Sequence, residues 1–242
     1  KTTQRGIRTV LHPSLSRRFR TNDRQLRYRR LRHDLYSDTL ESSVLSKRGN
    51  KYAQVFGTSF GWSPVFPMRR KSDAPEALGL LFARDGVPPK MIIDGSKEQM
   101  LGQLRSKCRQ ADCHIRATEP YSAWSNAAEG TIREVKRGAG RKMVKKKSPK
   151  RLWDDCLELE GSIRSHTAHD IFELNGEVPE TIMSGETSDI SPFCELEWYD
   201  WVYFRETSVS FPNDKEVLGR YLGPSIDIGP AMTVKILKSN GQ

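Results

Sequence analysis

The sequence has no apolar run that approaches the roughly 20 residues a membrane-spanning helix requires, and no signal-peptide pattern at its start. We therefore expect a soluble protein with no membrane partner. Cysteine is scarce: the four cysteines among 242 residues match neither a disulfide framework nor a complete zinc motif. A reducing intracellular compartment is the simplest explanation. Because the chain begins at Lys1 rather than at Met, we expect it to be a piece of a longer polypeptide.

Acidic residues are also in deficit, and the deficit is local. Residues 1–36 hold 11 Lys/Arg against 2 acids, and residues 133–151 hold 10 against 1. Residues 152–204 reverse this balance, with 13 acids and one basic residue. Two concentrated basic blocks favour a polyanionic partner, and nucleic acid above others. A solvated tail and a solubilising helix face would give the same composition.

The apolar pattern predicts an α/β fold with a mixed sheet flanked by helices. The expected strands lie at residues 35–45, 51–60, 62–70, 88–94 and 113–119. The first three form an antiparallel meander that turns at residues 47–50. The expected helices include residues 72–86, a segment with Met100, Leu101, Leu104 and Cys108 on one face, and residues 126–146 and 150–168. Later runs such as EWYDWVYFRE and KEVLGRYLGPS indicate a small antiparallel sheet or barrel.

These patterns divide the chain into four segments. We expect a basic N-terminal arm or linker (1–34), a core (35–178), a connecting segment (179–204) and a small β-rich C-terminal unit (205–242).

Three acidic residues stand where this sheet order would bring them together: Asp38 in the first strand, Asp94 at the end of the fourth, and Glu129 at the start of a helix. A carboxylate at the end of a buried strand is costly to keep ionised unless a cation meets it. Mg²⁺ prefers oxygen ligands and needs few protein carboxylates. Two such ions about 3.5–4 Å apart support phosphoryl transfer. Each acid also has an ordinary alternative, as an exposed strand residue, a turn residue or a first-turn helix residue.

The spacing of these three acids and the sequence segments around them resemble those of a known protein family. Between Asp38 and Asp94 lie 55 residues, and between Asp94 and Glu129 lie 34. With the segments IIDGSKEQ, EPYSAWSNAAEGTIREVKR and VPETIMSGETSDIS, the chain resembles the catalytic core of retroviral-type and copia-type retrotransposon integrases. Such a core is part of a retroelement polyprotein.

The resemblance implies a ribonuclease-H-like fold, with a mixed five-stranded sheet and a small C-terminal β extension. It implies that Asp38, Asp94 and Glu129 are catalytic and hold two Mg²⁺ or Mn²⁺ ions. The implied activity is that of a polynucleotidyl transferase and endonuclease, which processes retroelement DNA 3′ ends and joins them to target DNA. A homo-oligomer is implied, acting in the nucleus after a cytoplasmic stage. The residues expected to contact DNA are Tyr121, Asn126, Arg133, Lys136 and Arg137.

The chain departs from the family pattern in ways that keep one alternative open. One residue is missing between Asn126 and Glu129, and a one-residue shift turns a helix position by about 100°. Gly95 replaces the usual Asn, and the family's His-His-Cys-Cys zinc module is absent from the chain. A catalytically impaired remnant that only binds nucleic acid therefore remains an alternative.

A second alternative is a ribonuclease of the same fold, cutting RNA–DNA hybrids. Such an enzyme would need a fourth group beside the triad. His114 and Asp170 are the loose candidates in this sequence.

Overall fold

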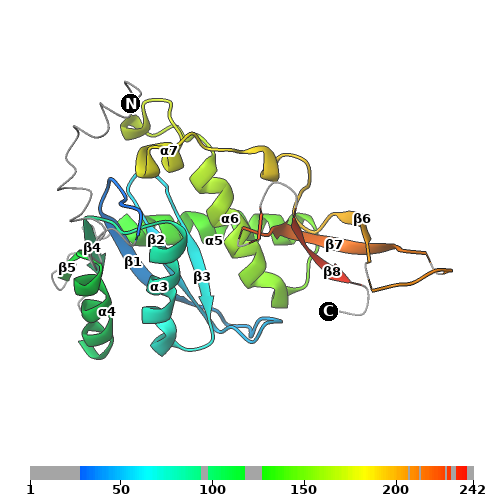
Figure 1. Ribbon diagram of the computed structural model, residues 1–242, viewed down its shortest axis with the longest axis horizontal. Helices are drawn as coiled ribbons and strands as arrows, with labels where there is room; N and C mark the ends of the chain where they lie inside the picture. Colours follow the sequence, from blue (N-terminus) through cyan, green and yellow to red (C-terminus); the bar gives the residue numbers. More distant parts are fainter. Residues whose placement is uncertain are drawn as a thin grey trace, which may run out of the picture.

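The core is a five-stranded sheet with the strand order β3-β2-β1-β4-β5 (Figure 1). The computed structural model describes residues 28–93, 98–117, 127–206, 208–212, 214–226, 228–229 and 233–238. The strands are β1 (Leu35–Glu41), β2 (Tyr52–Gly57), β3 (Val65–Met68), β4 (Lys90–Ile93) and β5 (His114–Ala117). β1, β2 and β3 are antiparallel neighbours, whereas β4 runs parallel to β1 and β5 runs parallel to β4. The predicted mixed five-stranded sheet is confirmed.

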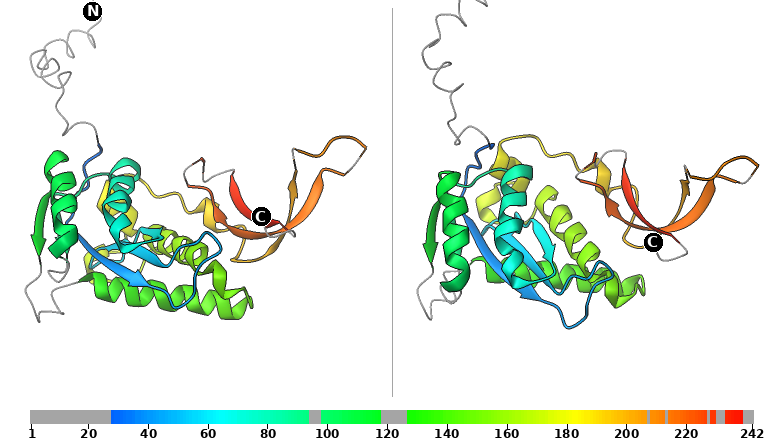
Figure 2. Two further views of the ribbon diagram at one scale, coloured as in Figure 1. Left: turned by 90° about the horizontal axis from the view of Figure 1, so that it is seen from below. Right: turned by 60° about the horizontal axis from the view of Figure 1, so that its bottom comes forward.

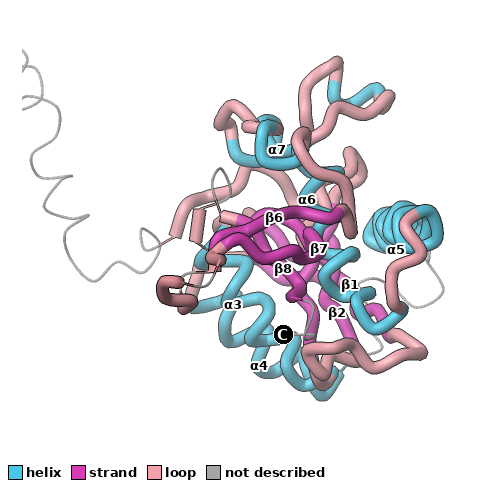
Figure 3. Tube along the Cα trace, turned by 90° about the vertical axis from the view of Figure 1, so that its right-hand side faces the viewer, coloured by secondary structure: helices cyan, strands magenta, loops and turns pink. Residues whose placement is uncertain are grey.

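Helices cover both faces of this sheet. They are α3 (Ala74–Arg84), α4 (Glu98–Gln110), α5 (Ala127–Lys145), α6 (Trp153–His166) and the short α7 (Pro179–Ser184). Figure 3 shows α3 and α4 on one side of the strands and α5 on the other. In the part of the chain that the structure describes, no helix is both long and apolar enough to cross a bilayer.

α3 shows how the sequence sets one of these helices. Its apolar residues at helical spacing are all buried, as the pattern predicts. Asp73 is the N-cap residue, but its carboxylate accepts a hydrogen bond from the backbone N–H of Arg70 at 3.0 Å instead of capping the helix. Gly86 ends the helix, with φ +122° and its N–H donating to the carbonyl of Leu81 at 3.1 Å.

The pleat of β1 divides the core into two buried clusters. Leu35 packs with Leu81 of α3 on one face. Leu40 packs with Val135 of α5 on the other face. Because side chains alternate along a strand, Asp38 shares the face of Leu40. Asp38 therefore lies on the side of the sheet that α5 covers.

The segment before β1 belongs to the core more than we predicted. Leu31 is 5% exposed, and its N–H donates to the carbonyl of Val87 at 2.9 Å. Arg30 forms a parallel bridge with Val87, and its guanidinium donates to the carbonyl of Ala111 at 2.9 Å. Burial of the apolar Leu31 holds this end of the predicted arm against the sheet. The rest of the arm, residues 1–27, lies outside the described residues.

The C-terminal segment forms a second, antiparallel sheet of β6 (Trp201–Arg205), β7 (Glu216–Pro224) and β8 (Val234–Lys238) (Figure 2). β6 begins inside the segment 179–204 that we predicted as a connection, because its backbone pairs with β7 from Trp201 onward. The sheet touches the core through α6, where Leu222 and Leu159 share one buried cluster. Independent folding of this unit stays a prediction.

Candidate active site

Asp38 lies within β1, opposite Val55 of β2. Its side chain is half-buried, and Oδ1 accepts a hydrogen bond from the backbone N–H of Thr39 at 2.6 Å. On the opposite face, the Gln54 amide donates to Ser37 and accepts from the Thr39 hydroxyl. These bonds fix the backbone on both sides of Asp38. The carboxylate is thus held on a central strand and is not the fully exposed strand acid of the ordinary alternative.

β4 ends beside the residue that precedes Asp38. Its last residue, Ile93, pairs in parallel register with Ser37 and is 7% exposed in the cluster on the α3 side. Asp94 follows Ile93 in the sequence. Asp94 lies outside the described residues, and so do Tyr121 and Asn126.

Glu129 lies in the first turn of α5. This end of the helix is anchored by Thr131, whose hydroxyl donates to the carbonyl of Thr58 at 3.1 Å. A Cβ at Gly57 would lie 2.9 Å from the Thr131 methyl group, so Gly57 allows α5 to approach β2 this closely. Since Gly57 pairs with Tyr36, the start of α5 is fixed near the beginning of β1.

The Glu129 carboxylate faces solvent, with 57% of its side chain exposed. Its Oε1 lies 3.5 Å from the Arg133 guanidinium, which is 73% exposed. The two residues therefore form an exposed i,i+4 pair on the surface of α5. Such an exposed pair contributes only about 0.3–0.5 kcal/mol to stability, so Arg133 remains accessible to another anion.

The three cations predicted to contact DNA follow Glu129 along the exposed face of α5. Arg133, Lys136 and Arg137 are all exposed. They stand at i+4, i+7 and i+8 from Glu129, spacings that share one side of a helix. The Arg137 guanidinium lies 3.9 Å from Glu134, a long exposed contact. This face presents positive charge next to the candidate site.

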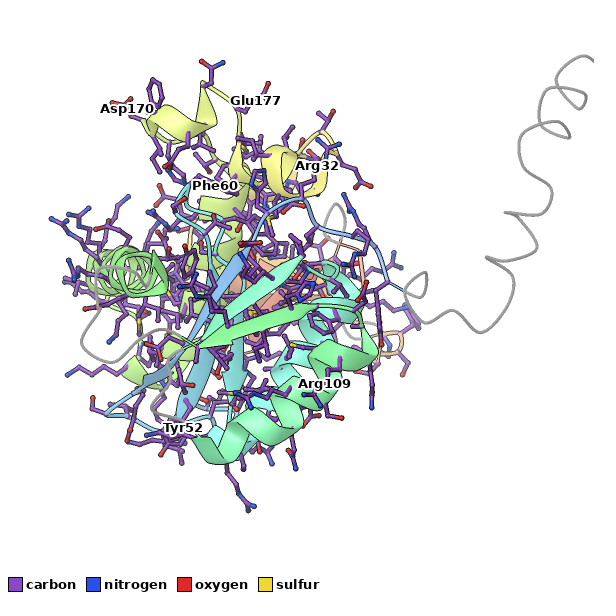
Figure 4. The ribbon with its side chains drawn as sticks, turned by 90° about the vertical axis from the view of Figure 1, so that its left-hand side faces the viewer. Arg32, Tyr52, Phe60, Arg109, Asp170 and Glu177 are labelled. Carbon is purple, nitrogen blue, oxygen red and sulfur yellow. The ribbon has the colours of Figure 1, made fainter. Side chains whose placement is uncertain are left out.

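Of the two candidates for a fourth group, His114 lies away from the end of β4 that Asp94 follows in sequence. His114 begins β5 and pairs with Lys90, the first residue of β4. It is therefore at the end of β4 opposite to Ile93, roughly 10 Å away along the strand. Asp170 is exposed in the loop after α6, near α7 (Figure 4). Neither position supports the ribonuclease alternative.

An acidic cluster that the sequence analysis missed lies at the start of α6. The Arg48 guanidinium, on the β1–β2 turn, lies 2.9 Å from Asp154 and 3.3 Å from Asp155. Burial raises the pKa of Asp155 to about 6, and the nearby Arg48 opposes this rise. Glu158 binds both Arg48 at 3.1 Å and Lys235 of β8 at 3.2 Å. Because basic partners hold these carboxylates, we assign the cluster to stability and not to catalysis.

Other features of the described structure lie away from the candidate site. A groove of about 770 Å³ runs beside α3 and β3, lined by residues such as Phe66, Leu80 and Arg84, and neither Asp38 nor Glu129 borders it.

Among the described residues, which do not include Asp94, no group of three His, Cys, Asp or Glu side chains could hold a metal ion.

No protein-family model and no curated protein matches the chain. Solved structures do match. A chain of the simian T-cell lymphotropic virus intasome, solved in complex with the PP2A regulatory subunit B56 gamma, aligns with a TM-score of 0.53 and 13% sequence identity. The alignment covers 84% of this chain and 78% of that one.

Two integrase core domains align over a smaller share of this chain. The HTLV-2 integrase catalytic core domain in complex with magnesium gives a TM-score of 0.46 at 12% identity, over 62% of this chain and 95% of that one. The BIV integrase core gives 0.44 at 12% identity, over 62% and 92%. At these identities the likeness concerns the fold. The strand order of the sheet and the intasome match, with its TM-score of 0.53, together show a ribonuclease-H-like fold.

Proposed function

We propose that this chain is the catalytic core of a retroelement integrase of the retroviral or copia type, which processes DNA 3′ ends and transfers them to target DNA. One observation carries the proposal. β4 runs parallel to β1 and ends at Ile93, beside Ser37, so that Asp94 follows a strand end next to Asp38. The match to the simian virus intasome chain supports the fold on which this arrangement depends.

The donor set fits divalent metal ions. Ile93 faces the α3 side of the sheet, and a strand continued by one residue turns its next side chain to the other face. Asp38 already lies on that other face, which α5 covers. Carboxylate oxygens are the donors that Mg²⁺ and Mn²⁺ prefer. Asp38, Asp94 and Glu129 would hold two such ions.

When bound, the two ions would activate the attacking oxygen and stabilise the leaving oxygen of a phosphodiester. The role of the protein is to position these groups. β1 gives Asp38 a fixed orientation, because the N–H of Thr39 binds one of its oxygens at 2.6 Å and Asp38 itself pairs with Val55 of β2. Arg133 and Lys136 on α5 would bind phosphates next to the reacting group, which offsets charge without occupying the carboxylates.

Two further predictions from the integrase resemblance are DNA as the substrate and a homo-oligomer as the active form. The basic face of α5 supports the first, since exposed Lys and Arg side chains on one side of a helix bind phosphate backbones. An intasome has been described for the simian virus chain, and a dimeric form for the HTLV-2 core. We extend oligomerisation to this chain as part of the proposal.

A nicking and joining assay tests the function. Supercoiled plasmid and a blunt duplex with a free 3′-hydroxyl are incubated with the chain and Mn²⁺. We expect nicked and joined products from the wild type, and a loss of at least about a hundredfold for Asp38→Asn, since each 1.36 kcal/mol of lost transition-state stabilisation is tenfold in rate. Asp34→Asn is the matched control, because Asp34 is in the same segment and pairs with Lys90 at 2.8 Å.

The same assay separates the alternatives. Full activity of Asp38→Asn would refute the catalytic proposal. Duplex binding by the wild type without any nicking would indicate the impaired remnant. Cleavage of an RNA–DNA hybrid in preference to plasmid would indicate a ribonuclease.

A further inference from the structure

The basic residues from Lys142 to Arg151, at the end of α5 and just after it, divide into two groups by their partners. Lys142 Nζ lies 2.7 Å from the Glu160 carboxylate of α6. Lys146 Nζ lies 2.6 Å from Asp200, in the turn before β6. Lys145 also pairs with an acidic residue of that turn, at 3.2 Å. Lys142 and Lys146 are partly buried in these pairs, so their charges are already neutralised, whereas Lys145 and its partner are both exposed.

The second group consists of exposed cations that form no ion pair within the described part of the chain. These are Lys147, Lys150 and Arg151, and together with the exposed Lys47 of the β1–β2 turn we call them the distal patch. Two segments far apart in sequence build it: the backbone N–H of Lys47, on the β1–β2 turn, donates to the carbonyl of Arg151 at 2.7 Å. Figure 2 shows this turn beside the end of α5.

Arg48, the residue after Lys47, has a different environment from the residues of the distal patch. Arg48 turns inward to Asp154 and Asp155. It satisfies the carboxylates at the start of α6, which would otherwise attract the patch. Lys47 is left facing solvent. The local acids are therefore occupied, and the patch keeps its positive charge.

The distal patch continues the basic face of α5. Between Glu129 and the patch the exposed side of the helix carries Arg133, Lys136, Arg137 and Arg141. α5 has 19 residues, which span about 27 Å at 1.5 Å per residue. Successive phosphates of a DNA strand are about 3.4 Å apart along the axis, so this length matches roughly eight base pairs.

We propose that the distal patch is a second phosphate-binding site, which holds the backbone of a nucleic-acid duplex lying along α5, at the end of the helix opposite to Glu129. A membrane surface fits less well, because an interfacial helix needs an apolar face and Val144 is the single large apolar side chain exposed on the described part of α5. A protein partner fits less well, because lysine is depleted in protein interfaces. The proposal concerns binding and does not require catalysis at the carboxylates.

The test is the salt dependence of duplex binding, measured in EDTA so that no metal-dependent reaction contributes. The patch variants are Lys150→Ala/Arg151→Ala and, independently, Lys47→Ala/Lys147→Ala. The control is Arg105→Ala/Arg109→Ala, which removes two exposed charges from α4. Figure 4 shows Arg109 on α4, across the sheet from α5. Affinity for a fluorescent duplex of about 24 base pairs is measured at several KCl concentrations.

Each lost phosphate contact lowers the slope of log affinity against log salt by about 0.9. We expect both patch variants to lower the slope by about 1.8, and the control to keep the wild-type slope. Equal slopes for patch variants and control would overturn the proposal. If the patch variants bind polyglutamate more weakly but bind the duplex as the wild type does, the patch serves an acidic protein. That result would also overturn the proposal. Because nicking activity plays no part in the readout, failure of the catalytic proposal leaves this result interpretable.

Discussion

Arg48 is the cation on which the acidic start of α6 depends. It is 39% exposed, whereas Asp154 is fully buried and Asp155 is 7% exposed. In Arg48→Met the alkyl part of the side chain is kept and the charge is lost. Asp154 then retains the side-chain amide of Asn50, at 2.8 Å. Glu158 retains its lysine partner from β8.

The expected loss of stability follows from this geometry. Removing one partner of a fully buried ion pair costs about 3–5 kcal/mol. Arg48 is partly exposed, and Asp154 keeps a hydrogen bond from Asn50. We therefore expect Arg48→Met to lower the free energy of unfolding by about 2–3 kcal/mol near neutral pH.

The loss should depend on pH. Burial raises the pKa of Asp155 from its ordinary 3.8 to about 6. Between these values the folded protein holds a proton that the unfolded chain has released, so stability falls as pH rises through this range. Without Arg48 the pKa of Asp155 rises further, and the fall becomes larger and extends to higher pH. Arg48→Met should therefore cost less at about pH 5 than at about pH 7.

Urea unfolding followed by tryptophan fluorescence measures this, since Trp153 is buried at the start of α6. The matched control is Lys47→Met, on the same turn but exposed, for which we expect a change within about 0.5 kcal/mol. A loss for Arg48→Met no larger than that of the control would refute the reasoning. An equal loss at both pH values would refute the role of Asp155.

Three further predictions follow from other parts of the structure. Lys136→Ala and Arg133→Ala should each lower the salt slope of duplex binding by about 0.9, and Lys136→Ala should leave Mn²⁺ affinity unchanged; unaltered slopes in both would show that this face of α5 does not touch DNA. Gly138→Ala should lower the free energy of unfolding by about 1–3 kcal/mol in urea titration, because a Cβ there would overlap the Glu160 carboxylate; a neutral effect would contradict this packing. Limited proteolysis should cleave first between α7 and β6 and release the C-terminal sheet intact, and resistance of that segment at every protease dose would argue against an independent unit.

The strand and helix order could be predicted because it rests on local patterns. Alternation in β1, the buried run of β4 and the helical spacing of α3 each carry their own signal. The ends were less predictable. Leu31 is a single apolar residue in a basic segment, and its burial depends on Val87, 56 positions along the chain. The run EWYDWVYFRE contains all of β6, but the segment boundary at residue 205 cuts this strand, which pairs with β7 from Trp201 onward.

The acidic residues of the candidate site could be predicted from the sequence. The ion-pair partners of the basic residues near it could not. The spacing in sequence singled out Asp38 and Glu129, and the structure places the first on the α5 side of the sheet and the second in the first turn of α5. The sequence shows a run of basic residues after Glu134 without showing which are neutralised. That Lys142 pairs with Glu160 while Arg151 stays exposed depends on how α6 packs against α5.

The proposed function depends on Asp38, Asp94 and Glu129 forming one metal site. Diffraction from crystals grown with Mn²⁺, measured near the manganese absorption edge, would locate the ions at this site. We predict two anomalous peaks about 3.5–4 Å apart, with Asp38 binding both ions and Asp94 and Glu129 each binding one. Absence of any peak beside Asp38, or a model in which the Asp38 and Asp94 carboxylates lie on opposite faces of the sheet, would contradict the account.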